Sequence, residues 1–238
     1  MTAKPVFDVP PAPRVAISGS AQVFPVRRVF CVGRNYAAHA VEMGNEVDRT
    51  APFYFTKSAH AVIPSGSIIA YPPGTRDCQY EMELVVAIGA DAFEVAEAEA
   101  LNAVYGYACG IDLTRRDLQA VAKEGRKPWD LGKDFEDSAI VGAITPAGEF
   151  GHLSDQAITL DLDGRRMQDG RLSEMVWGVS EIIAHLSRYY HLAPGDLIFT
   201  GTPAGVGPVA PGSVLSGHID GLEPIALTLN AQASKANA

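Results

Sequence analysis

The chain has 238 residues and a formal net charge of −9, with 47% hydrophobic residues, 23 Gly and 16 Pro. This length and composition predict a single globular domain with many turns and short strands. The acidic balance argues against a nucleic-acid partner, because phosphate binding needs clustered Lys and Arg. No uninterrupted apolar run approaches the roughly 18 residues that span a bilayer, and no apolar signal segment opens the chain, so we expect a cytoplasmic protein with no membrane partner.

The cysteine pattern argues against disulfide bonds and against a structural zinc site. Cys31, Cys78 and Cys109 are odd in number, widely spaced and without a Cys-x-x-Cys pair. This pattern predicts neither a disulfide framework nor a zinc knuckle, and it fits a reducing compartment.

The first half of the chain alternates strand and helix signals. We expect an extended arm over 1–26, one domain over 27–230 and a disordered tail over 231–238. "RRVFCVG" (27–33) predicts a strand, and "RNYAAHAVEMG" (34–44) predicts a short helix ended by Gly44. "YEMELVVAIG" (80–89) predicts a strong strand, followed by a helix over 94–103.

The second half continues this pattern. We expect a buried strand over 103–111, then a helix over 112–125 with Thr114 as its N-cap and Gly125 at its end. Alternating residues over 157–170 predict a hairpin around Asp163-Gly164, and the apolar stripe over 175–192 predicts a helix. The sum is a β-dominated α+β fold.

Two acids interrupt the apolar strand at 80–89. Alternate side chains of a strand share a face, so Glu81 and Glu83 point the same way, about 7 Å apart at their Cα atoms. An exposed strand face is the simple interpretation. The alternative is a ligand pair, because the following "LVVAIG" predicts a strand buried on both faces, where two anions need a cation.

Asp112 follows the apolar strand 103–111, where side chains project beyond the end of a sheet. It either caps the next helix or joins the two glutamates. Glu81, Glu83 and Asp112 together form an all-oxygen set, which favours Mg²⁺ or Mn²⁺ over zinc.

His39 and Glu42 are three residues apart in an expected helix, so the carboxylate can orient the imidazole. The pair is either a surface contact or a general base acting on water. Lys57, Arg116, Gln119 and Lys133 lie beside apolar or Gly-containing segments and are each, alone, ordinary solvated residues. "GTPAGVG" (201–207) lacks the Gly-Lys-[Ser/Thr] of a phosphate loop; it is a plain turn or a ligand loop that contributes Thr202.

Six blocks occur in one order: "GRNYAAHAVEMG", "PFYFTKS", "YEMELVVAIG", "GIDLTRRDLQ", "KPWDLGKDF" and "LIFTGTPAGVG". In this order they resemble the fumarylacetoacetate hydrolase family over roughly residues 27–230. The resemblance implies a mixed β-sandwich roll of the C-terminal-domain type, a homodimer, and a catalytic domain over 27–230. It also implies a bound Mg²⁺, with Mn²⁺ or Ca²⁺ as alternatives.

The resemblance also assigns roles to residues. Glu81, Glu83 and Asp112 match the metal ligands, and His39 and Glu42 match a water-activating pair in a segment that acts as a lid. The remaining active-site positions fall on residues assigned to catalysis, Gln119 and Lys133, and to substrate binding, Arg34, Lys57, Arg116 and Thr202.

Some features depart from the family. Gln79 stands where many members have Asp or His, and we expect no counterpart of the large N-terminal domain of the long eukaryotic enzymes. "TRRDLQ" with "GRKPWDLGK" is most similar to bacterial fumarylpyruvate hydrolases of gentisate breakdown, a part of aromatic catabolism.

The expected reaction is metal-dependent hydrolysis of a carbon–carbon bond in an anionic 2,4-diketo acid, with fumarylpyruvate giving fumarate and pyruvate. Three alternatives stay open. The first is an oxaloacetate decarboxylase or tautomerase, and the second is an isomerase or decarboxylase of unsaturated dicarboxylic acids, such as a 2-hydroxyhepta-2,4-diene-1,7-dioate isomerase. The third is a metal-stabilised scaffold without activity.

Overall fold

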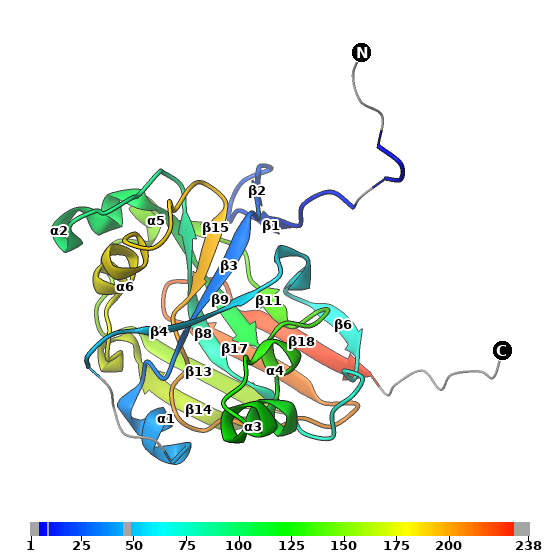
Figure 1. Ribbon diagram of the computed structural model, residues 1–238. Helices are drawn as coiled ribbons and strands as arrows, with labels where there is room; N and C mark the ends of the chain where they lie inside the picture. Colours follow the sequence, from blue (N-terminus) through cyan, green and yellow to red (C-terminus); the bar gives the residue numbers. More distant parts are fainter. Residues whose placement is uncertain (1–4, 9, 45–48, 231–238) are drawn as a thin grey trace.

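The computed structural model describes residues 5–8, 10–44 and 49–230, so the tail expected at 231–238 lies outside the described residues. Strands dominate the fold (Figure 1). Their bounds are β1 Arg14–Ala16, β2 Val23–Pro25, β3 Arg28–Gly33, β4 Phe53–Lys57, β5 Val62–Pro64, β6 Ser67–Ala70, β7 Cys78–Tyr80, β8 Met82–Ile88, β9 Val104–Asp112, β10 Thr114–Arg115, β11 Ala139–Val141, β12 Thr145–Pro146, β13 Ala157–Leu162, β14 Arg165–Arg171, β15 Asp196–Phe199, β16 Gly207–Pro208, β17 Val214–Ile219 and β18 Ile225–Asn230.

Two large mixed sheets form the body of the fold. The larger has the order β4-β3-β15-β8-β9-β11-β5, with β12 paired to β9 outside this path. The second has the order β14-β13-β17-β18-β6. Parallel pairs (β15 with β3, β11 with β5, β18 with β6) occur beside antiparallel ones, which confirms the mixed β architecture expected.

The hydrophobic core has two parts, one on each face of the larger sheet. Leu84 and Val86 of β8 point to the cluster that also contains residues of β13, β17 and β18. Val85 and Ala87 point to the opposite cluster, which β1 and β2 cover. Every residue of β8 is buried, so this strand is covered on both faces as its composition predicted.

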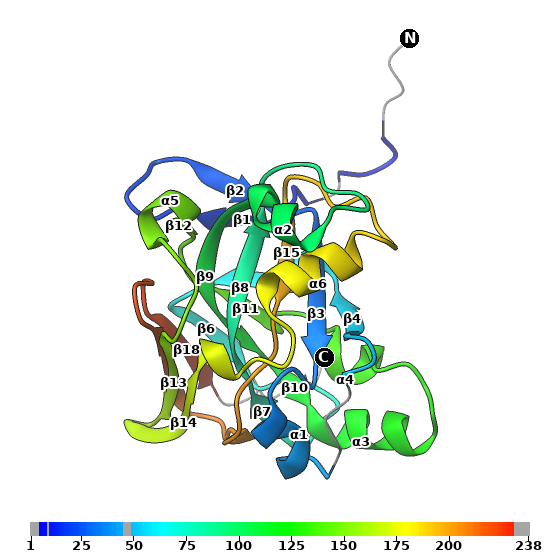
Figure 2. The same cartoon turned by 90° about the vertical axis from the view of Figure 1, so that its left-hand side faces the viewer.

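Short helices lie around the sheets. They are α1 Ala37–Glu42, α2 Glu97–Ala100, α3 Arg116–Glu124, α4 Asp130–Lys133, α5 Ala147–Phe150 and α6 Val179–Leu186, with 3₁₀ turns η1 Ala59–Ala61, η2 Leu101–Ala103 and η3 Leu172–Glu174. Figure 2 shows α1 and α3 together with β7 and β10 at one end of the molecule, and α2, α5 and α6 at the other. Among the described residues, no helix has the length and hydropathy to cross a membrane.

Two turn signals in the sequence are confirmed. The hairpin β13–β14 turns at Asp163 and Gly164, which have φ of 51° and 80°, the left-handed values of a two-residue hairpin loop. Gly44 follows α1 with φ of 68° and donates its N–H to the Val41 carbonyl, so it ends that helix.

The helix expected over 112–125 begins later than the sequence indicated. Thr114 and Arg115 pair with β7 as a short strand, so α3 starts at Arg116 and ends before Gly125. Thr114 is not the N-cap, because its hydroxyl accepts a hydrogen bond from the Lys133 ammonium.

The helix expected over 175–192 is also shorter, because a buried side chain holds its N-terminal part. The Asn35 side chain accepts a hydrogen bond from Trp177 N–H and donates one to the Trp177 carbonyl. These bonds take up both backbone groups of Trp177, so Trp177 stays outside the helix. The helix α6 starts at Val179, where Glu181 accepts the Gly178 N–H at 2.7 Å. Over 94–103, α2 covers only Glu97–Ala100 and a 3₁₀ turn follows.

The N-terminal segment packs on the body of the protein from β1 onward, whereas Val6 and Phe7 before it are exposed. The strands β1 and β2 pair with each other, and Val15 and Phe24 are buried in the second core cluster. The three cysteines are all buried and unpaired.

Candidate active site

The three acids singled out in the sequence converge. Glu81 lies in the break between β7 and β8, Glu83 lies in β8, and Asp112 ends β9, which pairs with β8. One carboxylate oxygen from each lies within 4.8 Å of the others. All three residues are at most 5% exposed, so the exposed-face interpretation is wrong.

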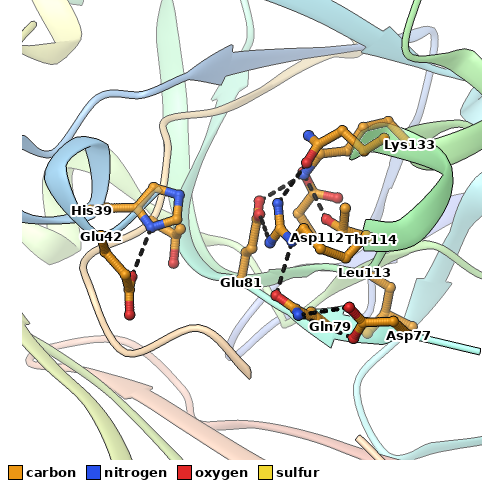
Figure 3. A network of polar contacts seen from close by, with 12 residues as sticks. His39, Glu42, Asp77, Gln79, Glu81, Asp112, Leu113, Thr114 and Lys133 are labelled. Carbon is orange, nitrogen blue, oxygen red and sulfur yellow. Dashed lines mark hydrogen bonds and ion pairs between the residues drawn. The ribbon is translucent and has the colours of Figure 1, made fainter. Parts of the chain in front are cut away.

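Cations surround Glu81 and Asp112. Lys133 Nζ lies 2.6 Å from Glu81 and 2.8 Å from Asp112, and it also donates to Thr114 at 2.7 Å (Figure 3). Arg116 contacts the other Glu81 oxygen at 2.5 Å. Burial favours the neutral acid, but Lys133 and Arg116 outweigh it and hold the pKa of Glu81 well below its usual value.

Glu83 has the opposite environment. Its carboxylate accepts the Gly201 N–H at 2.7 Å, and no Lys or Arg forms an ion pair with it in the described part of the chain. Burial, then Asp112 and Glu81, raise its pKa well above the usual value. A buried acid beside two others, without its own cation, fits a site for a divalent ion with oxygen ligands.

Lys57 is placed differently from its expected role in substrate binding. It does not line the pocket; its side chain is fully buried, and Nζ lies 2.8 Å from Asp112. That contact is an ion pair, and the ammonium donates its hydrogen bonds to Ser138 at 3.0 Å and to the carbonyls of Leu113 and Lys133. These contacts make Lys57 a support for Asp112 rather than a substrate ligand.

The His39–Glu42 pair faces the acids from α1 (Figure 3). His39 Nδ1 lies 3.2 Å from Glu42, and the imidazole lines the pocket. Glu42 also accepts the N–H of Gly205 at 3.1 Å, which fastens α1 to the Gly-rich loop. A carboxylate that binds Nδ1 leaves Nε2 to act as a base.

The pocket rim carries the other expected residues. Arg34, Arg116, Gln119 and Thr202 all line it. Arg34 has φ of 58°, a left-handed backbone conformation that residues other than glycine rarely adopt. Such residues are often found at functional sites. Arg116 donates to Gln119 Oε1 at 2.7 Å, which leaves the Gln119 NH₂ group directed to other acceptors.

Gln79 and Asp77 extend this network behind Arg116. Arg116 Nε donates to Gln79 Oε1 at 2.8 Å, and Gln79 Nε2 donates to the Asp77 carboxylate at 3.0 Å (Figure 3). The residue that departs from the family pattern therefore orients the pocket arginine.

The sequence did not identify several residues of the site. Thr114 is two residues from Asp112 in extended chain, so the two side chains share one side of the strand, a signal that could have found it. Phe55 and Trp129 form an aromatic wall, with ring centroids 5.9 Å apart, and Gln168 reaches the site from the second sheet. No local signal marks Gln168, because its partners are distant in the chain.

Comparison with known proteins identifies the family. The model of the fumarylacetoacetate (FAA) hydrolase C-terminal family matches residues 28–230. The chain belongs to the fumarylacetoacetate hydrolase family. Together with the fumarylpyruvate hydrolases among its relatives, the family indicates an enzyme, a hydrolase that acts on carbon–carbon bonds.

Individual relatives agree with this assignment. Fumarylpyruvate hydrolase from Ralstonia sp. is 48% identical over 79% of this chain and 98% of its own length. Oxaloacetate tautomerase YcgM of Escherichia coli is 35% identical over 85% of this chain and 93% of its own. The crystal structure of fumarylpyruvate hydrolase from Pseudomonas aeruginosa in complex with Mn²⁺ and pyruvate has a TM-score of 0.93 and 45% identity, covering 96% of this chain and all of that one. With the acidic triad, this relative supports a divalent-cation site here.

Proposed function

We propose that the enzyme hydrolyses an acylpyruvate, a 2,4-diketo acid, and that fumarylpyruvate is cleaved to fumarate and pyruvate. The observation that carries the proposal is the pairing of a buried acidic triad with a His39–Glu42 base on the opposite wall of one pocket. Similarity to the fumarylpyruvate hydrolases of Ralstonia sp. and Pseudomonas aeruginosa supports the choice of substrate.

The proposed roles follow from the contacts. A divalent cation held by Glu81, Glu83 and Asp112 would supply Lewis-acid stabilisation of the enolate charge that develops on cleavage. His39, oriented by Glu42, removes a proton from water as the water oxygen bonds to the acyl carbonyl carbon. The bond from that carbon to the methylene group then breaks, its electron pair stays on the pyruvate fragment, and protonation of the methylene carbon completes pyruvate.

Other residues hold the charges of the substrate. Gln119 is the best placed donor to the oxygen that becomes negative, since Arg116 fixes its amide and leaves the NH₂ group unused. Arg34, Arg116 and Thr202 bind the carboxylates of the diacid. All three hydrogens of the Lys133 ammonium have partners here, so Lys133 contacts substrate only by exchanging one of them.

The setting of this activity is part of the proposal. We propose magnesium as the cation, because a triad of carboxylates suits a hard ion, and a catalytic domain over 27–230. We also propose a homodimer that works in the cytoplasm in gentisate breakdown. Light scattering during gel filtration measures the assembly.

Product identification tests the reaction. The enzyme is incubated with Mg²⁺ and fumarylpyruvate or oxaloacetate, and the products are identified by NMR. We expect fumarate and pyruvate in equal amounts from fumarylpyruvate. Carbon dioxide release or keto–enol exchange of oxaloacetate, with no cleavage of fumarylpyruvate, would contradict the proposal and support the alternative activities.

A further inference from the structure

Gln168 connects the second sheet to the active site although it does not line the pocket. It lies in β14 and is fully buried. Its Oε1 accepts the N–H of Met82 at 3.0 Å, between the two triad glutamates. Its Nε2 donates to the Pro203 carbonyl at 2.9 Å and to Thr202 Oγ1 at 2.7 Å.

The two backbone partners fix the orientation of this amide. A peptide N–H only donates and a carbonyl oxygen only accepts, so the side-chain oxygen must face Met82 and the nitrogen must face Pro203. A flipped amide would leave two buried backbone groups unsatisfied. The second Nε2 hydrogen is then necessarily the one that points at the Thr202 hydroxyl oxygen.

The polarity of the Thr202 hydroxyl follows from this constraint. A hydroxyl has one hydrogen and two lone pairs, and Gln168 occupies a lone pair. Among the residues that the structure describes, no protein group accepts the Thr202 hydrogen. Thr202 lines the pocket, so that hydrogen is available to an anion bound there.

We propose that Gln168 is a positioning residue that makes Thr202 a hydrogen-bond donor to a carboxylate of the substrate. The inference rests on the proposed function in one respect, namely that the ligand is a keto acid. The close fit of the Gly-rich loop on β14 supports it, because a side chain at Gly170 would collide with Pro203. This packing keeps the loop beside β14, so Thr202 stays within hydrogen-bond distance of Gln168.

Pyruvate binding to the Mg²⁺-loaded protein, measured by titration calorimetry, tests the proposal without turnover. We expect Thr202→Val and Gln168→Met each to weaken pyruvate binding roughly tenfold, the scale of one hydrogen bond to a charged group. The double variant should bind no worse than Thr202→Val, because Gln168 acts through that hydroxyl. With fumarylpyruvate the same variants should raise KM and change kcat little.

Matched variants separate this role from a structural one. Gln156→Met removes a glutamine that also bonds to a loop, at Ser154 N and the His152 carbonyl, and should leave pyruvate affinity unchanged. Gln168→Glu keeps an acceptor for Met82 N–H but, when ionised, has no hydrogen to donate to Thr202 or to the Pro203 carbonyl. It should lose affinity like Gln168→Met, and circular dichroism checks that the variant is folded.

Three results would overturn the proposal: unchanged pyruvate affinity in folded Gln168→Glu, unchanged affinity in Thr202→Val, or a double variant weaker by the product of both effects. The proposed function fails separately. An enzyme that does not cleave fumarylpyruvate but loses pyruvate affinity in these variants would refute the reaction and leave the role of Gln168 intact.

Discussion

Lys57 Nζ lies 2.8 Å from Asp112 Oδ1, and neither side chain is accessible to solvent. The lysine comes from β4 and the aspartate from β9, so the pair joins two strands that are not neighbours in the sheet. Removing one cation from a buried carboxylate is costly, because the remaining charge stays buried with less compensation. This pair therefore links the stability of the fold to the position of Asp112, one of the three proposed metal ligands.

Lys57→Met is expected to lower the free energy of unfolding by about 3–5 kcal/mol, because it leaves Asp112 buried with one fewer cation. Urea denaturation followed by circular dichroism measures the loss. Lys127→Met, at an exposed lysine, is the control and should change stability by less than about 0.5 kcal/mol. A loss below 1 kcal/mol in Lys57→Met would show that Asp112 does not depend on this pair.

Divalent cations are expected to stabilise the protein through the acidic triad. At a free concentration about 100 times Kd, a cation that binds only the folded state adds about 2.7 kcal/mol. Thermal denaturation with Mg²⁺, Mn²⁺ or EDTA measures this stabilisation as a shift of Tm. The shift should disappear in Glu83→Gln and persist in Glu99→Gln, a change at an exposed acid; a shift that survives Glu83→Gln would place the cation elsewhere.

His39→Ala should reduce hydrolysis by about 10²–10⁴-fold, the contribution typical of a general base. Its affinity for divalent cations should stay nearly unchanged, because the imidazole is outside the triad. Initial rates and a metal titration measure the two quantities. His152→Ala, an exposed histidine, serves as the control, and a large fall in metal affinity in His39→Ala would refute the assigned role.

Asp117 is expected to contribute to the fall in the free energy of unfolding at acid pH. Partial burial raises its pKa, but hydrogen bonds from the Arg76 N–H and the Thr75 hydroxyl lower it more, so the net pKa is below its usual value. A depressed pKa in the folded state contributes stability that is present above the ordinary pKa of about 3.9 and is lost as pH falls through the lower folded value.

Asp117→Asn should therefore be less stable than the wild type near pH 7, and the difference should narrow as the pH falls below about 4. Urea unfolding at several pH values between 3 and 7 measures this. Asp91→Asn, at an exposed acid, is the control. A difference that stays constant across this range would remove Asp117 from the acid response.

The sequence by itself determined the features that depend on neighbouring residues. Alternation along 80–89 put Glu81 and Glu83 on one face, and Asp163-Gly164 and Gly44 marked a turn and a helix end through their backbone freedom. The order of the six blocks predicted the family, and with it the mixed β fold and the acidic triad. These features need only local geometry or a pattern along the chain.

The tertiary structure decided where side chains meet across the fold. Asn35 shortened the helix at 175–192, and Thr114 became a partner of Lys133 rather than a cap. Lys57 is buried against Asp112 instead of lining the pocket as expected, and Gln168 contacts Thr202 from the second sheet. A buried polar group takes whichever partner the packing brings within reach, since leaving it unpaired costs more than any local preference.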